Sequence, residues 1–463
     1  MAELSVTPTA IDGLLVVQLD VRADNRGWFK ENWQRAKMVA LGLPDFAPVQ
    51  NNVSFNTSAG ATRGIHAEPW DKLVSVVRGR IYGAWVDLRP GDGFGTVVTL
   101  ELGPDTAVFV PRGVGNAFQT LTDETVYSYL VNDHWSLAAK DSYTFCNLAD
   151  ETLAIDWPIP LDQAELSEAD RNHPRLSAVT PMSPPRRLVL GAGGQLGRAL
   201  LAAWPDATGL TRADLDLADP AAVAQLDLSG YGLVVNAAAY TAVDAAETEQ
   251  GRRDAWAVNV AAVGALVEAA REHRTTLVHV SSDYVFDGTI EVHTEDESYS
   301  PLGVYGQTKA AGDAVVATLP RHYLLRTSWV IGDGKNFVAT IASLADRGIA
   351  PSVVADQFGR LTFTDEIVAA VDHLLAVGAP YGTYNVSNGG PVTSWADIAK
   401  DVYAARGKDP ALVTEVSAEE YGRGKELAPR PRHSALDLAK ITATGFAPRP
   451  ARDRLAPYLA ELG

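Results

Sequence analysis

The sequence is poor in cysteine and in positive charge, and both shortages limit what the protein can be. Its only cysteine, Cys146, excludes an intrachain disulfide framework and any CxxC redox or zinc site. It has 39 Lys and Arg residues against 57 Asp and Glu residues, a net charge of -18, and the basic residues are scattered. Binding to nucleic acid or to an anionic membrane draws on clustered basic side chains, so we expect neither partner.

The sequence also lacks long apolar runs and targeting signals. No apolar stretch approaches the length needed to span a membrane. The N-terminal stretch MAELSVTPTAIDGLLVV has no basic region followed by an apolar core and a cleavage site. We therefore expect an unprocessed, cytoplasmic protein.

What the sequence has is enough material for more than one core. Its 463 residues are 46% hydrophobic and 21% charged, which is typical of globular chains. This length exceeds what one hydrophobic core normally organises, so two or three domains are expected, with two preferred.

The two halves of the sequence have different rhythms. Up to about residue 135, short β-branched and aromatic runs such as TVYSYLV alternate with turn signals, which predicts an all-β jelly roll or sandwich. Later, strand and helix patterns alternate, which predicts a doubly wound parallel sheet with a smaller substrate-binding part. Between them, LSAVTPMSPPRR has the composition of a linker. We predict domains at residues 1–176 and 187–463 joined by a linker at 177–186.

A glycine turn opens the second domain. In LVLGAGGQLGRALL, Gly191, Gly194 and Gly197 stand between an apolar strand and a helix, which is the context of a dinucleotide-binding turn. Gly191 permits the tight turn, Gly194 lets the backbone approach a diphosphate, and Gly197 allows close helix packing. A glycine-rich turn without a ligand is the alternative.

The residues that follow bear on the choice of cofactor. About twenty residues after the first glycine, Arg212 occupies the place where an acidic residue would hold the ribose hydroxyl of NAD. A guanidinium there suits the 2'-phosphate of NADP. Asp214 and Asp216 are close by, so NADPH is expected and NADH stays possible.

A tyrosine and a lysine follow at helical spacing. Tyr305 precedes Lys309 by four residues in VYGQTK, so the two side chains share one helix face. A neighbouring ammonium is expected to lower the pKa of the phenol and make Tyr305 a general acid or base. Ser282, at the end of the strand in VHVSSDY, can donate a hydrogen bond to the same substrate oxygen.

The first half has its own cluster of polar residues. In ATRGIHAEPWDKLV, His66 follows Arg63, and Lys72 lies six residues later. A histidine can remove a proton from carbon next to a ketone, and an ammonium can hold the enolate oxygen. A structural histidine is the alternative. A metal-dependent cupin needs several ligands at close spacing, which this sequence does not supply, so we predict no metal.

The second half resembles the dTDP-4-dehydrorhamnose reductases of the short-chain dehydrogenase/reductase superfamily. The matching stretches include GAGGQLG, VVNAAAYTAVDAAE, SSDYVFDG, VYGQTK, RTSWVIGDGKNFV and APRPRHSALD. The resemblance implies a catalytic triad of Ser282, Tyr305 and Lys309. The implied cofactor-binding residues are Gly191, Gly193, Gly194, Gln195, Leu196, Gly197, Arg212, Asp216, Leu217, Asn236, Ala237, Ala238, Tyr240, Tyr305 and Lys309. The implied substrate-binding residues are Val243, Asp283, Trp329 and Asn336.

The first half resembles the dTDP-4-dehydrorhamnose 3,5-epimerases, which are metal-free cupins. The matching stretches include RGWFKE, QNNVS, RGIH, KLVSVVRG, VPRGVGNAF and LSEAD. The resemblance implies that His66 is the base, that Asp170 orients it and that Lys72 stabilises the enolate. It also implies a nucleotide pocket formed by Arg26, Phe29, Glu31, Gln50, Asn52 and Arg63.

The first half departs from the epimerase pattern at two places. Asn116 stands where the family has histidine, and His134 and Trp135 stand where it has the tyrosine that reprotonates the sugar. Tyr129 matches a second family tyrosine and is the candidate acid. Epimerisation at two carbons, at one carbon, or binding alone stay open for this domain.

The two resemblances imply consecutive reactions on one dTDP-sugar. The first half would epimerise dTDP-4-keto-6-deoxyglucose at carbons 3 and 5, and the second would reduce the 4-ketone. We therefore expect a bifunctional enzyme of dTDP-L-rhamnose synthesis and a homodimer. A reductase of another deoxysugar and a nucleotide-sensing protein without activity are the alternatives.

Overall fold

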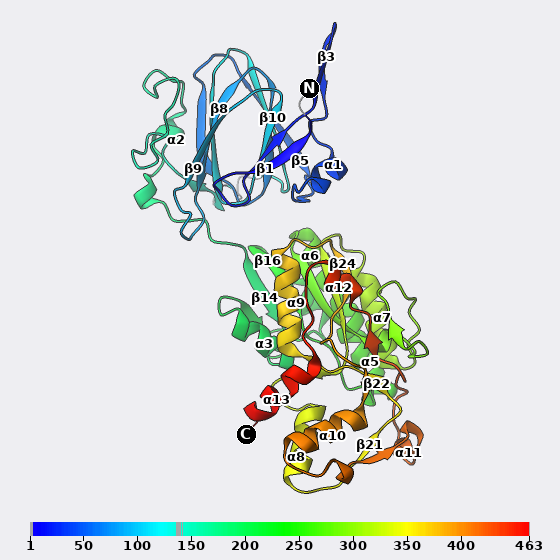
Figure 1. Cartoon of the computed structure of the whole chain (residues 1–463). Coiled ribbons are helices and arrows are strands. Elements are labelled where there is room, and N and C mark those ends of the chain that lie inside the picture. Colours follow the sequence, from blue (N-terminus) through cyan, green and yellow to red (C-terminus); the bar gives the residue numbers. More distant parts are fainter. Residues whose placement is uncertain (1–2, 136–139, 141, 463) are drawn as a thin grey trace. The chain divides into compact units, whose positions relative to one another are not determined.

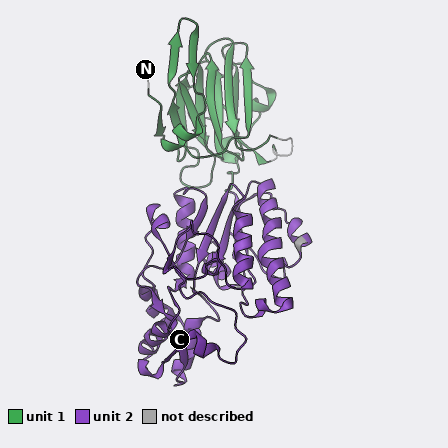
Figure 2. Cartoon of the chain, turned by 90° about the vertical axis from the view of Figure 1, so that its right-hand side faces the viewer, with its two compact units in different colours: residues 1–184 green, residues 185–463 purple. Residues whose placement is uncertain are grey.

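The computed structural model describes residues 3–135, 140 and 142–462. The chain divides into two compact units, residues 1–184 and 185–463 (Figure 2). The division falls inside the predicted linker. Residues just before it still pack on unit 1, because Met182 is buried and its N–H donates to the carbonyl of Leu88. Within the described residues, no helix is both long and apolar enough to cross a bilayer.

Unit 1 consists of two antiparallel sheets, as the strand pattern predicted (Figure 1). The six-stranded sheet contains, in spatial order, β1 (Ser5–Pro8), β2 (Leu15–Gln18), β10 (Thr106–Val110), β7 (Lys72–Arg78), β12 (Thr125–Val131) and β5 (Gln50–Asn56). The five-stranded sheet contains β13 (Thr144–Phe145), β6 (Thr62–Ala67), β11 (Val114–Thr120), β8 (Ile81–Asp87) and β9 (Val97–Leu102). A hairpin of β3 (Val21–Asp24) and β4 (Gly27–Lys30), and the short helices α1 (Arg35–Ala40) and α2 (Glu168–Arg171), complete the unit.

The core of unit 1 lies between its sheets. One apolar cluster joins Val74 and Val108 of the six-stranded sheet to Trp85 and Phe118 of the five-stranded sheet. Alternate side chains of each strand point into this space, and burying each large apolar side chain stabilises the fold by about 1.5–3 kcal/mol. The two sheets thereby hold β6, which carries His66, opposite β7, which carries Lys72.

Unit 2 has a six-stranded parallel sheet with helices on both faces (Figure 2). Its strands in spatial order are β15 (Thr208–Leu210), β14 (Arg186–Leu190), β16 (Tyr231–Asn236), β17 (Thr276–Ser282), β19 (His322–Thr327) and β24 (Gly382–Asn385). Its longer helices are α3 (Gln195–Ala203), α5 (Glu249–Trp256), α6 (Ala262–Glu272), α7 (Val304–Val316), α8 (Phe337–Asp346), α9 (Thr364–Ala376), α10 (Trp395–Ala405) and α13 (Ala451–Glu461). Its shorter helices are α4 (Pro220–Ala224), α11 (Ala418–Gly422) and α12 (Ala439–Ala443). The predicted doubly wound fold is confirmed.

Alternation along the strands explains why both faces of this sheet are covered. In β14, Val189 packs in the cluster that includes α3 and α9, whereas Leu188 and Leu190 pack in the cluster that includes α6. Strands buried on both faces are typical of parallel sheets. The carboxyl ends of β14, β16, β17 and β19 meet at one edge of the sheet, which is where ligands bind in open α/β folds.

A smaller layer of unit 2 has its own core. It is formed by α8, α10 and α13, and its buried residues include Ile341, Val402 and Leu459. Unit 2 also contains short two-stranded sheets, which pair β18 (Val292–His293) with β27 (Ala435–Leu436), β20 (Val330–Ile331) with β23 (Thr362–Phe363), β21 (Ser352–Val354) with β26 (Thr414–Val416), and β22 (Phe358–Gly359) with β25 (Thr393–Ser394). This layer places Trp329 and Trp395 at the edge of the large cavity described below.

Candidate active sites

A large cavity of unit 2 lies at the carboxyl edge of its parallel sheet. It has a volume of about 860 Å³. Most of the residues predicted from the sequence for this unit line it: Gly191, Gly193, Gly194, Gln195, Leu196, Arg212, Asp216, Leu217, Ala237, Ala238, Tyr240, Val243, Ser282, Asp283, Tyr305, Lys309 and Trp329. Gly197, Asn236 and Asn336 do not line it.

The glycine turn leaves no room for side chains at two of its positions. Gly191 has a φ of +79°, and a Cβ there would lie 2.8 Å from the backbone nitrogen of Ala238. A Cβ on Gly197 would lie 2.1 Å from the carbonyl oxygen of Gly191. At Gly193, by contrast, a Cβ would meet its nearest atom only at 4.0 Å. The turn is therefore closed on the protein side and open toward the cavity, at the start of α3, where backbone N–H groups favour an anion.

Arg212 lines this cavity and is largely exposed. Its side chain is 84% exposed and its Nε is 3.6 Å from Oδ1 of Asp216. Asp214 faces another way, because its carboxylate accepts hydrogen bonds from the N–H and the hydroxyl of Thr211. Arg212 is thus the charged side chain of this stretch with the greatest freedom to meet a ligand.

Ser282 and Tyr305 come together at the end of β17. The hydroxyl of Ser282 donates to Oδ1 of Asp283 at 3.0 Å and accepts from the N–H of Tyr284 at 3.2 Å. Burial raises the pKa of Tyr305 to about 12, although its hydrogen bond with Ser282 acts in the opposite direction. The phenol therefore stays protonated near neutral pH.

The expectation that Lys309 lowers the pKa of Tyr305 is wrong. Nζ of Lys309 donates to the carbonyl of Val280 at 2.8 Å and lies 3.3 Å from Nε2 of His279, so the ammonium faces β17. Burial lowers the pKa of Lys309 to about 8. Burial thus determines the direction of the pKa shift for both groups, and Lys309 is not among the groups that shift the pKa of Tyr305.

Two aromatic residues stack beside the catalytic candidates. The rings of Trp329 and Trp395 are 3.7 Å apart and 19° from parallel, and both line the cavity. Sequence reasoning missed Trp395, the first residue of α10, because its stacking on Trp329 depends on the packing of segments that are distant in the sequence. Asn336 instead caps α8 through the N–H of Ala339 and donates to the hydroxyl of Tyr458.

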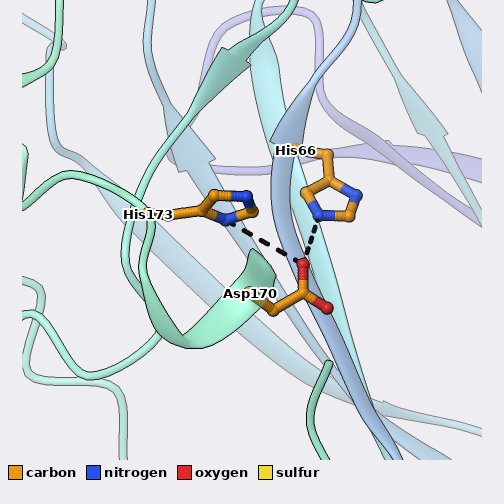
Figure 3. A group of neighbouring side chains, drawn as sticks. All are labelled: His66, Asp170 and His173. Atoms are coloured by element: carbon orange, nitrogen blue, oxygen red, sulfur yellow. Dashed lines mark hydrogen bonds and ion pairs between the residues drawn. The ribbon is translucent and has the colours of Figure 1, made fainter. Parts of the chain in front are cut away.

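Unit 1 holds a second cavity, of about 440 Å³, between its sheets. Five residues predicted from the sequence line it: Arg63, His66, Lys72, Tyr129 and Asp170. His66 on β6 and Asp170 on α2 are 2.8 Å apart between Nε2 and Oδ1 (Figure 3). Burial disfavours the ionised carboxyl, but the hydrogen bonds from His66 and Ser167 and the attraction to His66 and His173 together outweigh it, so the pKa of Asp170 is lowered.

A second histidine reaches the same carboxylate. Nδ1 of His173 lies 3.9 Å from Oδ1 of Asp170 (Figure 3), and its ring stacks on Phe145. Burial and the neighbouring His66 lower the pKa of His173, which keeps it neutral. Among the described residues, His66, Asp170 and His173 form a group whose spacing could hold a metal ion. Sequence reasoning missed His173, which follows Asp170 by three residues.

A carboxylate that sequence reasoning missed pairs with Lys72. Nζ of Lys72, whose side chain is 3% exposed, lies 3.0 Å from Oε1 of Glu68. Oε2 of Glu68 accepts from the indole of Trp70 at 2.6 Å. Glu68 follows His66 by two residues, which is the spacing of side chains on one face of an extended chain, so the signal was present.

The cavity of unit 1 is lined by tyrosines, although neither His134 nor Trp135 supplies the phenol of the epimerase pattern. Trp135 lines the cavity, and so do Tyr127, Tyr129 and Tyr143. Tyr127 donates to the amide oxygen of Asn116, whereas burial raises the pKa values of Tyr129 and Tyr143. Tyr143 was not predicted from the sequence.

The remaining residues predicted for the nucleotide lie elsewhere in unit 1. Phe29 and Glu31 line a separate cavity of about 320 Å³. Arg26 pairs with Asp24 at the tip of the β3–β4 hairpin, and Gln50 donates to Asn52 on β5. Among the described residues, none of these five lines the cavity of His66.

Both units match known families. The family described as RmlD substrate binding domain matches residues 186–463, and the family described as dTDP-4-dehydrorhamnose 3,5-epimerase matches residues 8–178.

Three known proteins represent these similarities. A protein of Streptococcus pyogenes serotype M6 called an RmlC homolog is 51% identical over 179 residues, which cover 38% of this chain and 90% of that protein. A probable dTDP-4,6-dihydroxy-2-methyloxan-3-one 4-ketoreductase of Streptomyces antibioticus is 39% identical over 275 residues, 57% of this chain and 90% of that protein. The crystal structure of dTDP-4-dehydrorhamnose reductase from Bacillus anthracis in complex with NADP is 30% identical, with a TM-score of 0.56, and the match covers 60% of this chain and 100% of that chain.

Proposed function

The chain belongs to the RmlD substrate binding domain family over residues 186–463 and to the dTDP-4-dehydrorhamnose 3,5-epimerase family over residues 8–178, and on this premise we propose a bifunctional enzyme. Unit 1 epimerises dTDP-4-keto-6-deoxyglucose at carbons 3 and 5. Unit 2 reduces the 4-ketone of the product with NADPH, which yields dTDP-L-rhamnose. One observation carries this proposal: a histidine–carboxylate pair and a Ser, Tyr and Lys set each line a cavity in the same chain.

In unit 1, His66 is the base. Its Nε2 faces Asp170, so Nδ1 is the nitrogen that takes the proton from carbon next to the ketone, and the carboxylate stabilises the resulting imidazolium. The electron pair of the broken C–H bond moves to the ketone oxygen, where the ammonium of Lys72 stabilises the enolate. Reprotonation at the other face inverts the carbon.

The proton for this second step comes from a phenol of the cavity. Tyr129 is the acid of this proposal, because it lines the cavity and stays protonated at neutral pH. Tyr143 is a second phenol in the same cavity. Replacing each by phenylalanine separates them: loss of epimerisation with Tyr129→Phe and its retention with Tyr143→Phe supports this assignment, and the reverse result moves the role to Tyr143.

In unit 2, the residues present fit a dinucleotide. The glycine turn is open toward the cavity at the start of α3, which suits a diphosphate, and Arg212 is free to meet a 2'-phosphate. NADPH supplies the hydride when bound. Tyr305 donates its proton to the ketone oxygen, Ser282 holds that oxygen by a hydrogen bond, and the stacked Trp329 and Trp395 border the place for the sugar.

A second copy of the chain completes the first site. Phe29 is 67% exposed on the hairpin, and Val53 and Phe55 are exposed on β5, which is an edge strand of the six-stranded sheet. An exposed apolar edge strand has unpaired backbone N–H and C=O groups that can form hydrogen bonds with a strand of another chain. We propose a homodimer in which the hairpin of one copy brings Arg26 and Phe29 to the His66 cavity of the other, where they bind the dTDP group.

The function is tested with the whole chain, NADPH and dTDP-4-keto-6-deoxyglucose. Oxidation of NADPH without any added epimerase, with dTDP-L-rhamnose identified by NMR, supports both activities. If oxidation of NADPH occurs only after a separate epimerase is added, unit 1 binds the dTDP-sugar without epimerising it. If no oxidation occurs even then, the reductase assignment is wrong.

A different deoxysugar is the second candidate. The Streptomyces antibioticus relative carries the name of another 4-ketoreductase, and Trp135 stands where the epimerase family has its tyrosine. A product inverted at one carbon, followed by reduction of its 4-ketone, is the outcome that supports this candidate.

A further inference from the structure

A fully buried histidine lies directly behind Lys309. His279 of β17 is 1% exposed and does not line the cavity, so it cannot touch the substrate. Its Nε2 lies 3.3 Å from Nζ of Lys309, which also donates to the carbonyl of Val280. His279 has no role in the proposed reduction as a proton donor or as a ligand of the substrate.

Asn236 determines which nitrogen of His279 carries the proton. The amide oxygen of Asn236 accepts the N–H of Ala238 at 3.2 Å, so its NH₂ group faces Nδ1 of His279 at 3.1 Å. Nδ1 therefore accepts a hydrogen bond, and a neutral imidazole that accepts at Nδ1 carries its hydrogen on Nε2. This Nε2–H points at Nζ of Lys309.

The hydrogen bonds that link Asn236, His279 and Lys309 can all form only when Lys309 is a neutral amine. An ammonium has three donors and no lone pair, whereas an amine can accept one hydrogen bond and donate others. With Lys309 as an amine, Nε2–H donates to Nζ and Nζ donates to Val280. With an ammonium, two donors face each other in a buried place, which is costly.

The other charged groups around Lys309 do not reverse this preference. Asp313, one turn further along α7, raises the pKa of Lys309, but burial dominates and the net direction is down. Asp313 is itself paired with Arg326 of β19. Tyr305, one turn earlier on α7, is a neutral phenol. His279 stays neutral because burial and Lys309 both lower its pKa.

We propose that His279, oriented by Asn236, is a positioning residue that holds Nζ of Lys309 and stabilises its amine form. This inference rests on the proposed reductase function of unit 2. In that reaction Tyr305 gives its proton to the ketone oxygen, and the ammonium of Lys309, one turn further along α7, returns a proton to the phenolate through a water of the cavity that both residues line. The amine that remains accepts the Nε2–H of His279 until solvent protonates it again. His279 thus helps Lys309 to release its proton in each cycle.

The first test reads the histidine directly and needs no enzyme activity. In the full chain labelled with ¹⁵N-histidine, the signal of His279 is identified among the nine histidines by its loss in His279→Gln. We expect a neutral ring protonated at Nε2 from about pH 6 to about pH 10, whose Nε2 shift follows a titration near pH 8 that disappears in Lys309→Met. A ring protonated at Nδ1, or no titration in that range, overturns the proposal.

The second test separates positioning from a merely structural role. In His279→Gln the side-chain oxygen can accept from the ammonium, so the basic limb of the pH profile of reduction should move up by about one pH unit. His322→Gln, which changes another buried histidine of unit 2, is the matched control and should leave the profile unchanged. An unchanged profile in His279→Gln overturns the proposal. A wild-type chain without reductase activity contradicts the proposed function instead, and the NMR titration then decides the inference alone.

Discussion

His66 and Asp170 are 104 residues apart in the sequence and 2.8 Å apart in the structure, between Nε2 and Oδ1. The contact exists because α2 brings the carboxylate to the end of β6, where His66 lines the cavity. A carboxylate in this position orients the ring and favours its protonated form after proton removal.

Replacing His66 by asparagine should therefore abolish proton removal next to the ketone. We expect exchange of the sugar hydrogens at carbons 3 and 5 with deuterated water to slow by about 100-fold or more, because general base catalysis typically contributes that much. Exchange is measured by NMR without NADPH, so that unit 2 does not consume the sugar. His134→Asn is the control, because His134 does not line the cavity. Equal exchange rates in wild type and His66→Asn would refute the assignment.

Arg212 should determine the preference for the phosphorylated cofactor. In Arg212→Ala we expect KM for NADPH to rise by about tenfold or more while KM for NADH changes little, since only NADPH has the 2'-phosphate. Arg253→Ala removes another exposed arginine, on α5 and outside the cavity, and serves as the control. If KM rises equally for NADPH and NADH in Arg212→Ala, Arg212 does not contact the 2'-phosphate.

The proposed dimer can be tested by mixing two inactive chains. His66→Asn removes the base, and a chain with both Arg26→Ala and Phe29→Ala removes the hairpin contribution. When both chains are produced together, about a quarter of the sites should combine an intact His66 with an intact hairpin and regain epimerisation. No recovery from chains that light scattering finds to be dimeric would show that each copy completes its own site.

Asp283 should make unit 2 less stable as the pH rises from about 4 to about 6. Burial raises the pKa of Asp283 to about 6. Because the folded state then binds more protons than the unfolded state in this range, its stability is greatest at the acid end and falls as the carboxyl ionises. Asp283→Asn should remove this loss and raise the stability of unit 2 at pH 7 by about 2–3 kcal/mol.

The measurement is the unfolding of the full chain by denaturant, followed in unit 2, at several pH values. Asp287→Asn is the control, because Asp287 is close in sequence and its pKa is lowered instead. A wild type and an Asp283→Asn chain with the same dependence on pH would contradict the prediction.

Removal of metal should leave epimerisation unchanged. The spacing of His66, Asp170 and His173 could hold an ion, but Nε2 of His66 already shares a hydrogen with Asp170. Deuterium exchange after prolonged dialysis against a chelator is the measurement, with NADPH absent. A loss that added zinc restores would show that this group is a metal site.

The sequence predicted residues that follow one another along a strand or a helix better than residues that meet through the fold. The glycine turn and the strand-end Ser282 are local features, and the structure places both at the cavity of unit 2. Tyr143 and His173 were missed because only the packing of β6, α2 and the segment after β12 brings them to His66. Glu68, by contrast, stands two residues from His66 and could have been predicted from that spacing.

Tyr305 and Lys309 show a second limit of prediction from the sequence, which concerns the direction of a side chain. Their spacing on α7 is as expected, but the direction of the lysine side chain depends on what β17 offers it. His279 and the carbonyl of Val280 lie on that strand, and no pattern within α7 reports them. Electrostatic effects of this kind depend on burial, which a short stretch of sequence does not reveal.

The division of one polypeptide into two separately cored units fixes a ratio. Every copy of the epimerase site is synthesised with one reductase site, so expression cannot change their proportion. The output of the pair then follows the slower of the two sites, and selection for a faster product flow acts on that site alone.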